Sequence, residues 1–132
     1  MIVLPIYWQK SSSKTVLVGM NWYRNAHYYE QNNLKQYYHQ LVGEQLEGIS
    51  PISGPFQLDL SLYYKNPNCD GSNIASMMEK VVLDALQEHQ IIINDNVKYH
   101  LGSTWRIITQ DKTNPRCEIN INSCEEENDP ST

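Results

Sequence analysis

Asn66-Pro67-Asn68-Cys69-Asp70-Gly71-Ser72-Asn73 opens the stretch of sequence that decides the fold, and Ile91-Ile92-Ile93-Asn94-Asp95 closes it. Between them, apolar residues recur at helical spacing and predict one buried helical face: Ile74, Met77, Met78, Val81, Val82, Ala85 and Leu86. Pro67 and Gly71 mark a turn before this helix, and Ser72 or Asn73 can cap it. The sequence therefore predicts an amphipathic helix flanked by two turns that carry Asp70 and Asp95.

A polar stripe runs beside the apolar face of this predicted helix. At 100° per residue, Asn73, Ser76, Lys80 and Asp84 fall on one line that begins next to Asp70. Taken singly, each group has a plain explanation: a turn, an exposed Lys–Asp ion pair, or an Asx turn. Their common phasing on one helix favours a functional site.

This pattern resembles the RusA family of Holliday-junction resolvases, found mostly in phages and prophages. The family reads Asp-x-Asp-Asn, Lys-x-x-x-Asp-Ala-Leu and a later Asp-Asp pair, where this chain has Asp70-x-x-Asn73, Lys80-x-x-x-Asp84-Ala85-Leu86 and Asn94-Asp95. The resemblance implies a homodimeric endodeoxyribonuclease that depends on Mg²⁺ or Mn²⁺ and nicks four-way DNA junctions. It implies Asp70 and Asp95 as metal ligands and Lys80 as the active-site lysine.

Such residues suit phosphodiester hydrolysis. A magnesium ion held by carboxylates can activate water and offset phosphate charge, and a nearby lysine can stabilise the charge that develops. Two positions depart from the family pattern: Ser72 replaces a metal-binding Asp, and Asn94 replaces the first Asp of the later pair. Glu79 is a poor substitute because it lies about 100° off the polar stripe. The third metal ligand stays open.

Three functions are therefore open. The first is an active resolvase, and the second is a junction-binding relative that has lost catalysis through Ser72. The third is an unrelated phage interaction protein whose acidic tail mimics nucleic acid.

A polar and aromatic segment lies upstream, at residues 19–27, and the sequence predicts a loop there. It resembles the Asn-rich loop before the first helix of RusA relatives, which contacts DNA in that family. Asn21, Tyr23, Arg24 and His27 are the expected DNA-binding residues here, together with Asn73. Aromatic rings and Arg can stack on unpaired bases or hold phosphate. The alternative is that Trp22 and Tyr23 cap the core.

Net charge argues neither strongly for nor against a DNA partner. The chain of 132 residues has 10 basic and 15 acidic residues, a net charge of −5. Glu125, Glu126, Glu127 and Asp129 lie in residues 123–132, so the remainder carries 10 basic against 15 − 4 = 11 acidic groups. A nearly neutral body can still gather Lys and Arg on one face. The three cysteines lack Cys-x-x-Cys spacing, which argues against a zinc site.

The remaining pattern predicts the fold. We expect strands at 2–7, 14–20, 56–64, 98–109 and 116–121, and a further helix at 32–46. This order indicates an α+β two-layer domain, a small mixed sheet covered by two helices, over residues 1–122. Residues 123–132 are expected to form a disordered acidic tail. Without a signal peptide or long apolar run, we expect a cytoplasmic protein, and the resemblance to RusA resolvases implies that it acts in the bacterial host of a phage or prophage.

Overall fold

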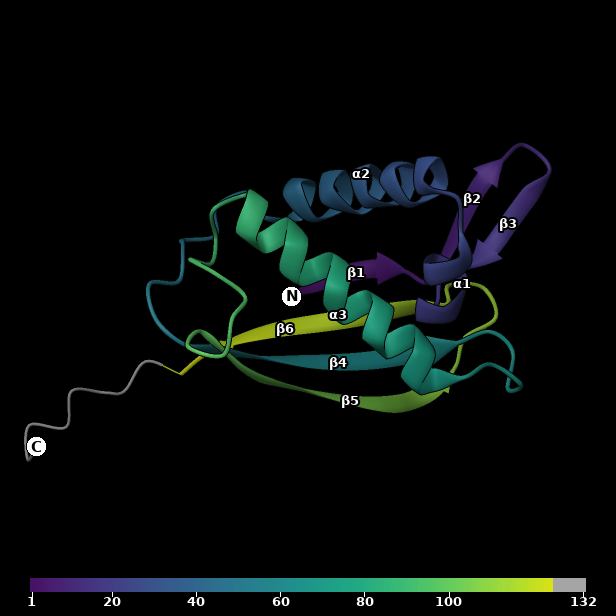
Figure 1. The fold of residues 1–132 in the computed structure, drawn as a ribbon. Coiled ribbons are helices and arrows are strands. Elements are labelled where there is room, and N and C mark those ends of the chain that lie inside the picture. The colour runs from purple at the N-terminus through teal and green to yellow at the C-terminus, as the bar shows by residue number, and fades with distance from the viewer. Residues whose placement is uncertain (125–132) are drawn as a thin grey trace, which may run out of the picture.

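The computed structural model describes residues 1–124. Its elements are β1 (Ile2–Pro5), β2 (Tyr7–Ser11), β3 (Lys14–Leu17), α1 (Met20–Asn25), α2 (Tyr28–Gln45), β4 (Phe56–Tyr64), α3 (Gly71–Glu88), β5 (His100–Gln110) and β6 (Arg116–Ser123). Helices α2 and α3 cover one face of the main sheet, and no helix formed by residues 1–124 lies over its other face (Figure 1). The predicted α+β fold, a mixed sheet covered by two helices, is confirmed.

The main sheet has four strands in the order β1-β6-β4-β5. β6 pairs antiparallel with both β1 and β4, whereas β4 and β5 run parallel with Leu60 opposite Trp105. Helix α3 connects these two parallel strands, as a parallel pair requires. Strands β2 and β3 form a separate hairpin, which projects from the end of the domain near α1 (Figure 1).

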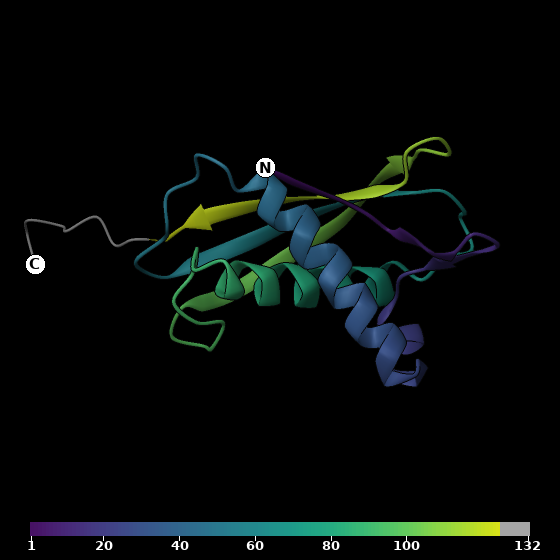
Figure 2. The ribbon, with the colours of Figure 1, turned by 90° about the horizontal axis from the view of Figure 1, so that it is seen from above.

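The core lies between the helices and the sheet. Phe56, Leu58, Leu60 and Leu62 alternate along β4 and are at most 2% exposed, which matches the period of two in the sequence. All seven apolar residues predicted for the buried face of α3 are buried. Helix α2 crosses over α3 when the domain is viewed from above (Figure 2).

Several boundaries differ from the sequence prediction. Residues 19–27 do not form the predicted loop, because Met20–Asn25 form helix α1. Six residues are too few for a stable isolated helix, so α1 depends on the tertiary contacts described below. Helix α2 begins at Tyr28 and not at residue 32, because His27 caps it. Ser123 ends strand β6 and the N–H of Cys124 donates to the carbonyl of Pro55, so these two residues belong to the domain; the rest of the predicted tail lies outside the described residues.

Candidate functional site

Asp70 is the N-cap of α3. Its Oδ1 accepts hydrogen bonds from the N–H of Asn73 (3.3 Å) and from the hydroxyl of Ser72 (2.9 Å). The side chain thus satisfies one of the free N–H groups that every helix start presents. Ser72, which stands where the RusA pattern has Asp, holds the Asp70 carboxylate in place.

Asn73 connects the start of α3 to α1. Its Oδ1 accepts a hydrogen bond from the N–H of Asn21 at 2.8 Å. Gly19, the N-cap of α1, packs so closely on this amide that a Cβ there would lie 2.6 Å from Nδ2 of Asn73. A side chain at position 19 would therefore displace the Asn73 amide. These contacts explain why the short helix forms, and they place two of the expected DNA-binding residues together.

An open pocket of about 250 Å³ lies between α1 and the start of α3. Its lining residues are mostly polar: Met20, Asn21, Arg24, Asp70, Ser72, Asn73 and Ser76. Arg24 is exposed and supplies a guanidinium at this pocket. A phosphate could be held here by Arg24 and by polar side chains near a helix N-terminus.

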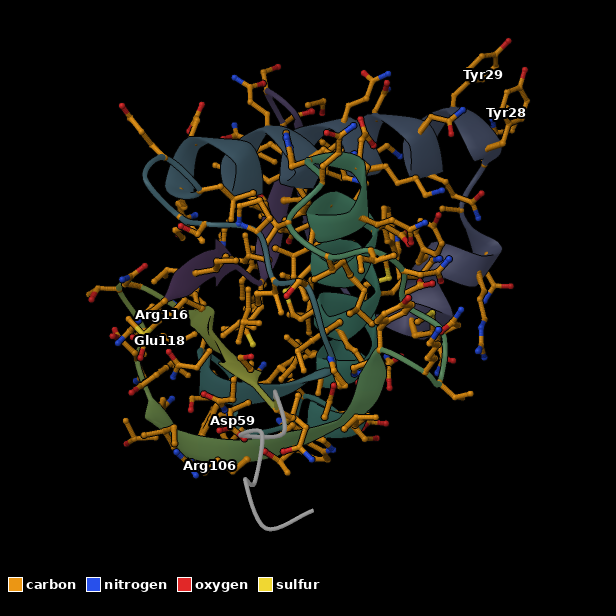
Figure 3. All side chains as sticks on the ribbon, turned by 90° about the vertical axis from the view of Figure 1, so that its left-hand side faces the viewer. Tyr28, Tyr29, Asp59, Arg106, Arg116 and Glu118 are labelled. Carbon is orange, nitrogen blue, oxygen red and sulfur yellow. The ribbon has the colours of Figure 1, made fainter. Side chains whose placement is uncertain are left out.

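At the start of α2, which follows α1 in the chain, three aromatic rings form an exposed cluster, which we call the His27–Tyr29 cluster. The ring of His27 lies 4.8 Å from that of Tyr28 and 4.9 Å from that of Tyr29, and the two tyrosine rings are 4.2 Å apart. Tyr28 and Tyr29 are 55% and 62% exposed, and both point away from the body of the protein (Figure 3). Large aromatic rings with this exposure can stack on a flat ligand.

The contacts within the cluster fix its geometry. Nδ1 of His27 accepts a hydrogen bond from the N–H of Tyr29 at 3.2 Å, which caps α2. A hydrogen bond with Tyr29 raises the pKa of Tyr28 above its usual value. Of the three, only His27 was expected to bind DNA from the sequence. The signal for the others was the run of three aromatic side chains, but Tyr28 and Tyr29 fall between the predicted loop at 19–27 and the predicted helix at 32–46.

Tyr23 does not join this surface. It is 9% exposed and belongs to the core, while its carbonyl accepts a hydrogen bond from the side chain of Gln31. Because Tyr23 is buried, its side chain is not placed to contact DNA as expected. Its position agrees with the alternative, an aromatic residue that caps the core. Asn21, Arg24 and His27 remain exposed.

Lys80 lies in a different place from Asp70. Ten residues separate the two along α3, or about 15 Å of helix. The ammonium of Lys80 is 3.4 Å from the carboxylate of Asp84 and 6.0 Å from the centre of the Tyr23 ring. It lines a polar groove between α2 and α3, together with Lys35, His39, Asp84, Gln87 and Glu88. Half-exposed Lys–Asp pairs of this kind contribute little to stability.

Asp95 lies in the loop between α3 and β5. The N–H of Ile52 donates to the carbonyl of Ile91 (2.7 Å), and the N–H of Phe56 donates to the carbonyl of Tyr99 (2.8 Å). These two bonds hold the loop beside the beginning of β4.

Asp70 follows the other end of β4, so the two expected metal ligands lie far apart. Helix α3 has 18 residues between them, about 27 Å at 1.5 Å per residue. The nine residues of β4 span about 30 Å. The structure brings Asp70 together with Asn73, Asn21 and Arg24, and separates it from Asp95 within one chain.

The described residues of a single chain therefore do not fit the magnesium site that the resemblance implies. Within residues 1–124, no group of three or more His, Cys, Asp or Glu side chains is arranged to hold a metal ion. Asp70 offers a single carboxylate, and one of its oxygens already accepts two hydrogen bonds. Protein sites for Mg²⁺ use one or two carboxylates with several waters, so Asp70 alone would bind the ion weakly.

No protein-family model matches the sequence, and no curated protein matches it either. The likeness to RusA resolvases thus rests on the residues quoted above. In the part of the chain that the structure describes, no helix is both long and apolar enough to span a membrane.

Proposed function

We propose that this chain binds branched DNA, as its resemblance to RusA resolvases implies, through the end of the domain that holds α1 and the starts of α2 and α3, which we call the DNA-binding corner (Figure 1). The observation that supports this most strongly is the His27–Tyr29 cluster, whose tyrosines are more than half exposed. Apolar surface that gathers in one exposed patch marks an interaction site. At the branch point of a junction, unpaired or poorly stacked bases offer flat faces to such rings.

The pocket between α1 and the start of α3 supplies the polar half of the interface. Arg24 can form a charge-assisted hydrogen bond with a phosphate. Asn21 and Ser76 can add neutral hydrogen bonds to the sugar–phosphate backbone. Asp70 and the negative net charge oppose DNA, so we expect moderate affinity that depends on salt.

Nicking of the junction is the second candidate function, and the motif around Asp70 is the observation that favours it. The residues of one chain give it less support than binding, because Asp70, Lys80 and Asp95 are spread along the length of α3. A junction-binding relative with impaired catalysis is therefore the preferred reading. A homodimer in the bacterial cytoplasm is part of this proposal, since a four-way junction has approximate two-fold symmetry.

A binding experiment with two matched DNAs tests the proposal. Fluorescence anisotropy of a labelled four-way junction should show tighter binding than a duplex of the same length and composition. Arg24→Ala should weaken junction binding and reduce the slope of log K against log salt by about one. Equal affinity for junction and duplex, or no binding to either at low salt, would contradict the proposal.

The same complexes, incubated with Mg²⁺ and run on a denaturing gel, separate binding from cleavage. We expect little nicking by the wild type. Rapid nicking that Asp70→Asn and Asp95→Asn each abolish would establish the resolvase and reject the impaired-relative reading.

A further inference from the structure

The two edge strands of the main sheet, β1 and β5, differ in how well they are protected from pairing with another strand. At the β1 edge, the side chain of Gln45 from α2 takes the place of a neighbouring strand. Its Oε1 accepts from the N–H of Val3 (2.7 Å), and its Nε2 donates to the carbonyl of Val3 (2.8 Å). β1 is also only four residues long and ends in Pro5. Short strands, proline and a covering helix are the usual protection of a sheet edge.

The β5 edge has none of this protection. β5 is 11 residues long and, within residues 1–124, pairs only with β4. Figure 1 shows it as the outermost strand of the sheet. Trp105, Ile107 and Ile108 are between 41% and 46% exposed, and Leu101 is 50% exposed. A long, exposed and apolar edge of this kind is a template for pairing with another strand.

We propose that the β5 edge pairs antiparallel with β5 of a second copy of this chain, so that two four-stranded sheets join into one of eight strands. This gives the homodimer its interface. The pairing rests on the edge strand, and only its use on a junction rests on the proposed function. Sheets of eight strands lie within the normal range.

The residues of β5 indicate a second copy as the occupant. Arg106 is the one charged side chain of the strand, which has no proline, Lys or Glu to discourage pairing. Its charge already has a counterpart on β4, because Arg106 contributes to lowering the pKa of Asp59, after hydrogen bonds from Thr104 and Asn122. Both Asp59 and Arg106 lie on the lower side of the sheet (Figure 3). Because β5 carries almost no charge, it does not require an acidic or basic partner strand, and a second copy of β5 can pair with it.

Two-fold symmetry restricts the registers in which the two β5 strands can pair. Irregular pairing with β4 near Phe56 and near Tyr63 leaves residues 102–107 as the regular part of β5. With the axis beside Trp105, this residue faces its own copy, Ser103 faces Ile107 and Thr104 faces Arg106. No like charges meet in this register, whereas an axis beside Arg106 would set two guanidinium groups against each other.

The joined sheet would bury the exposed side chains of Trp105 and Ile107 beside the edge of the helix layer. A Cβ on Gly71 would lie 2.8 Å from Ile107 and 3.2 Å from Trp105, so these side chains lie on the helix face beside the start of α3. A two-fold axis normal to the sheet keeps the helices of both copies on one face. The two DNA-binding corners then also lie on that face, as binding across a junction requires.

Light scattering on the full chain tests the interface. The wild type should have twice the chain mass of 15.3 kDa, and Trp105→Lys and Ile107→Lys should each reduce it to the monomer mass. Val97→Lys is the matched control, because Val97 is 90% exposed and lies outside β5; this variant should stay dimeric. A monomeric wild type at all concentrations, or dimers that survive both β5 substitutions, would overturn the proposal.

Hydrogen exchange on the wild type avoids any doubt about folding of the variants. Backbone amides of residues 103–107 should exchange more slowly at concentrations that favour the dimer than on dilution. Unchanged exchange in a protein that dimerises would place the interface elsewhere. A dimer with β5 protection that binds no DNA would reject the proposed function and leave this pairing intact.

Discussion

Asn73 of α3 accepts a hydrogen bond from the backbone N–H of Asn21 in α1 at 2.8 Å. The backbone N–H of Asn73 also donates to the Asp70 cap. Asn73 therefore joins the start of α3 to α1, the short helix that carries Arg24. The candidate DNA-binding corner is thus assembled from segments more than 50 residues apart in the chain, since this bond alone spans 52 positions.

Removing the Asn73 side chain should loosen α1. Asn73→Ala should lower the free energy of unfolding by about 1 kcal/mol, the usual net value of one hydrogen bond, and should weaken junction binding. Asn73→Asp is the matched control, because its carboxylate can accept the same bond. Urea denaturation and junction anisotropy check both variants; an Asn73→Ala protein with unchanged stability and affinity would show that the bond does not anchor α1.

Two substitutions should separate the effect of the Asp70 hydrogen bond on stability from the effect of its charge. Asp70→Ala should cost about 1 kcal/mol of stability through loss of the N-cap, whereas Asp70→Asn should retain most of the cap. Chemical denaturation of the two variants provides the comparison. Equal losses would mean that the carboxylate charge, and not the hydrogen bond to Asn73, is what stabilises the helix start.

Stability should fall at alkaline pH because of buried weak acids. Burial raises the pKa of the Cys117 thiol from 9.0 to about 12, so the folded state holds this proton more tightly than the unfolded chain. The resulting stabilisation is complete below pH 9 and is lost as pH rises toward about 12. The slope from this thiol approaches about 1.4 kcal/mol per pH unit within that window.

Tyr38 should add to this effect at higher pH. Burial raises its pKa well above the ordinary 10.0, and its hydroxyl donates to the carbonyl of Pro5 at 2.6 Å. Urea denaturation from pH 8 to just below pH 10, where the ionisation of tyrosine in the unfolded chain only begins, reports mainly on the thiol. Cys117→Ala should flatten the curve between these values, and an unchanged curve would show that the thiol is not the titrating group.

Ser72→Asp should create affinity for magnesium. It would put a second carboxylate beside Asp70, where the Ser72 hydroxyl now donates a hydrogen bond at 2.9 Å. Ion binding to the folded state raises Tm, so Mg²⁺ at constant ionic strength should stabilise this variant more than the wild type. Ser76→Asp adds the same charge one turn further along α3 and should respond less. A wild type that responds as strongly as Ser72→Asp would show that another residue already completes the site.

Much of the fold follows from local patterns in the sequence. The strict alternation in β4 and the apolar face of α3 reflect the period of each element, and together they predict the two-layer domain. The apolar face also predicts a long helix, and the 18 residues of α3 span about 27 Å. Asp70 and Asp95, which the resemblance assigns to one metal site, therefore lie beyond opposite ends of this helix.

Other features depend on contacts between distant segments. Helix α1 forms because Gly19 and Asn21 pack on Asn73, which a reading of residues 19–27 alone cannot show. The exposed edge of β5 follows from the order of strands in the sheet, and strand order is not a property of any single strand.

The central claim, that the corner at the start of α2 contacts branched DNA, is tested most directly by replacing both tyrosines of the His27–Tyr29 cluster. Stacking of one base on an aromatic ring contributes roughly 1–3 kcal/mol. Tyr28→Ala with Tyr29→Ala should therefore weaken junction binding by about tenfold or more. Tyr28→Phe with Tyr29→Phe, which keeps both rings, should bind like the wild type in the same anisotropy titration. Wild-type affinity in the double alanine variant would contradict the claim.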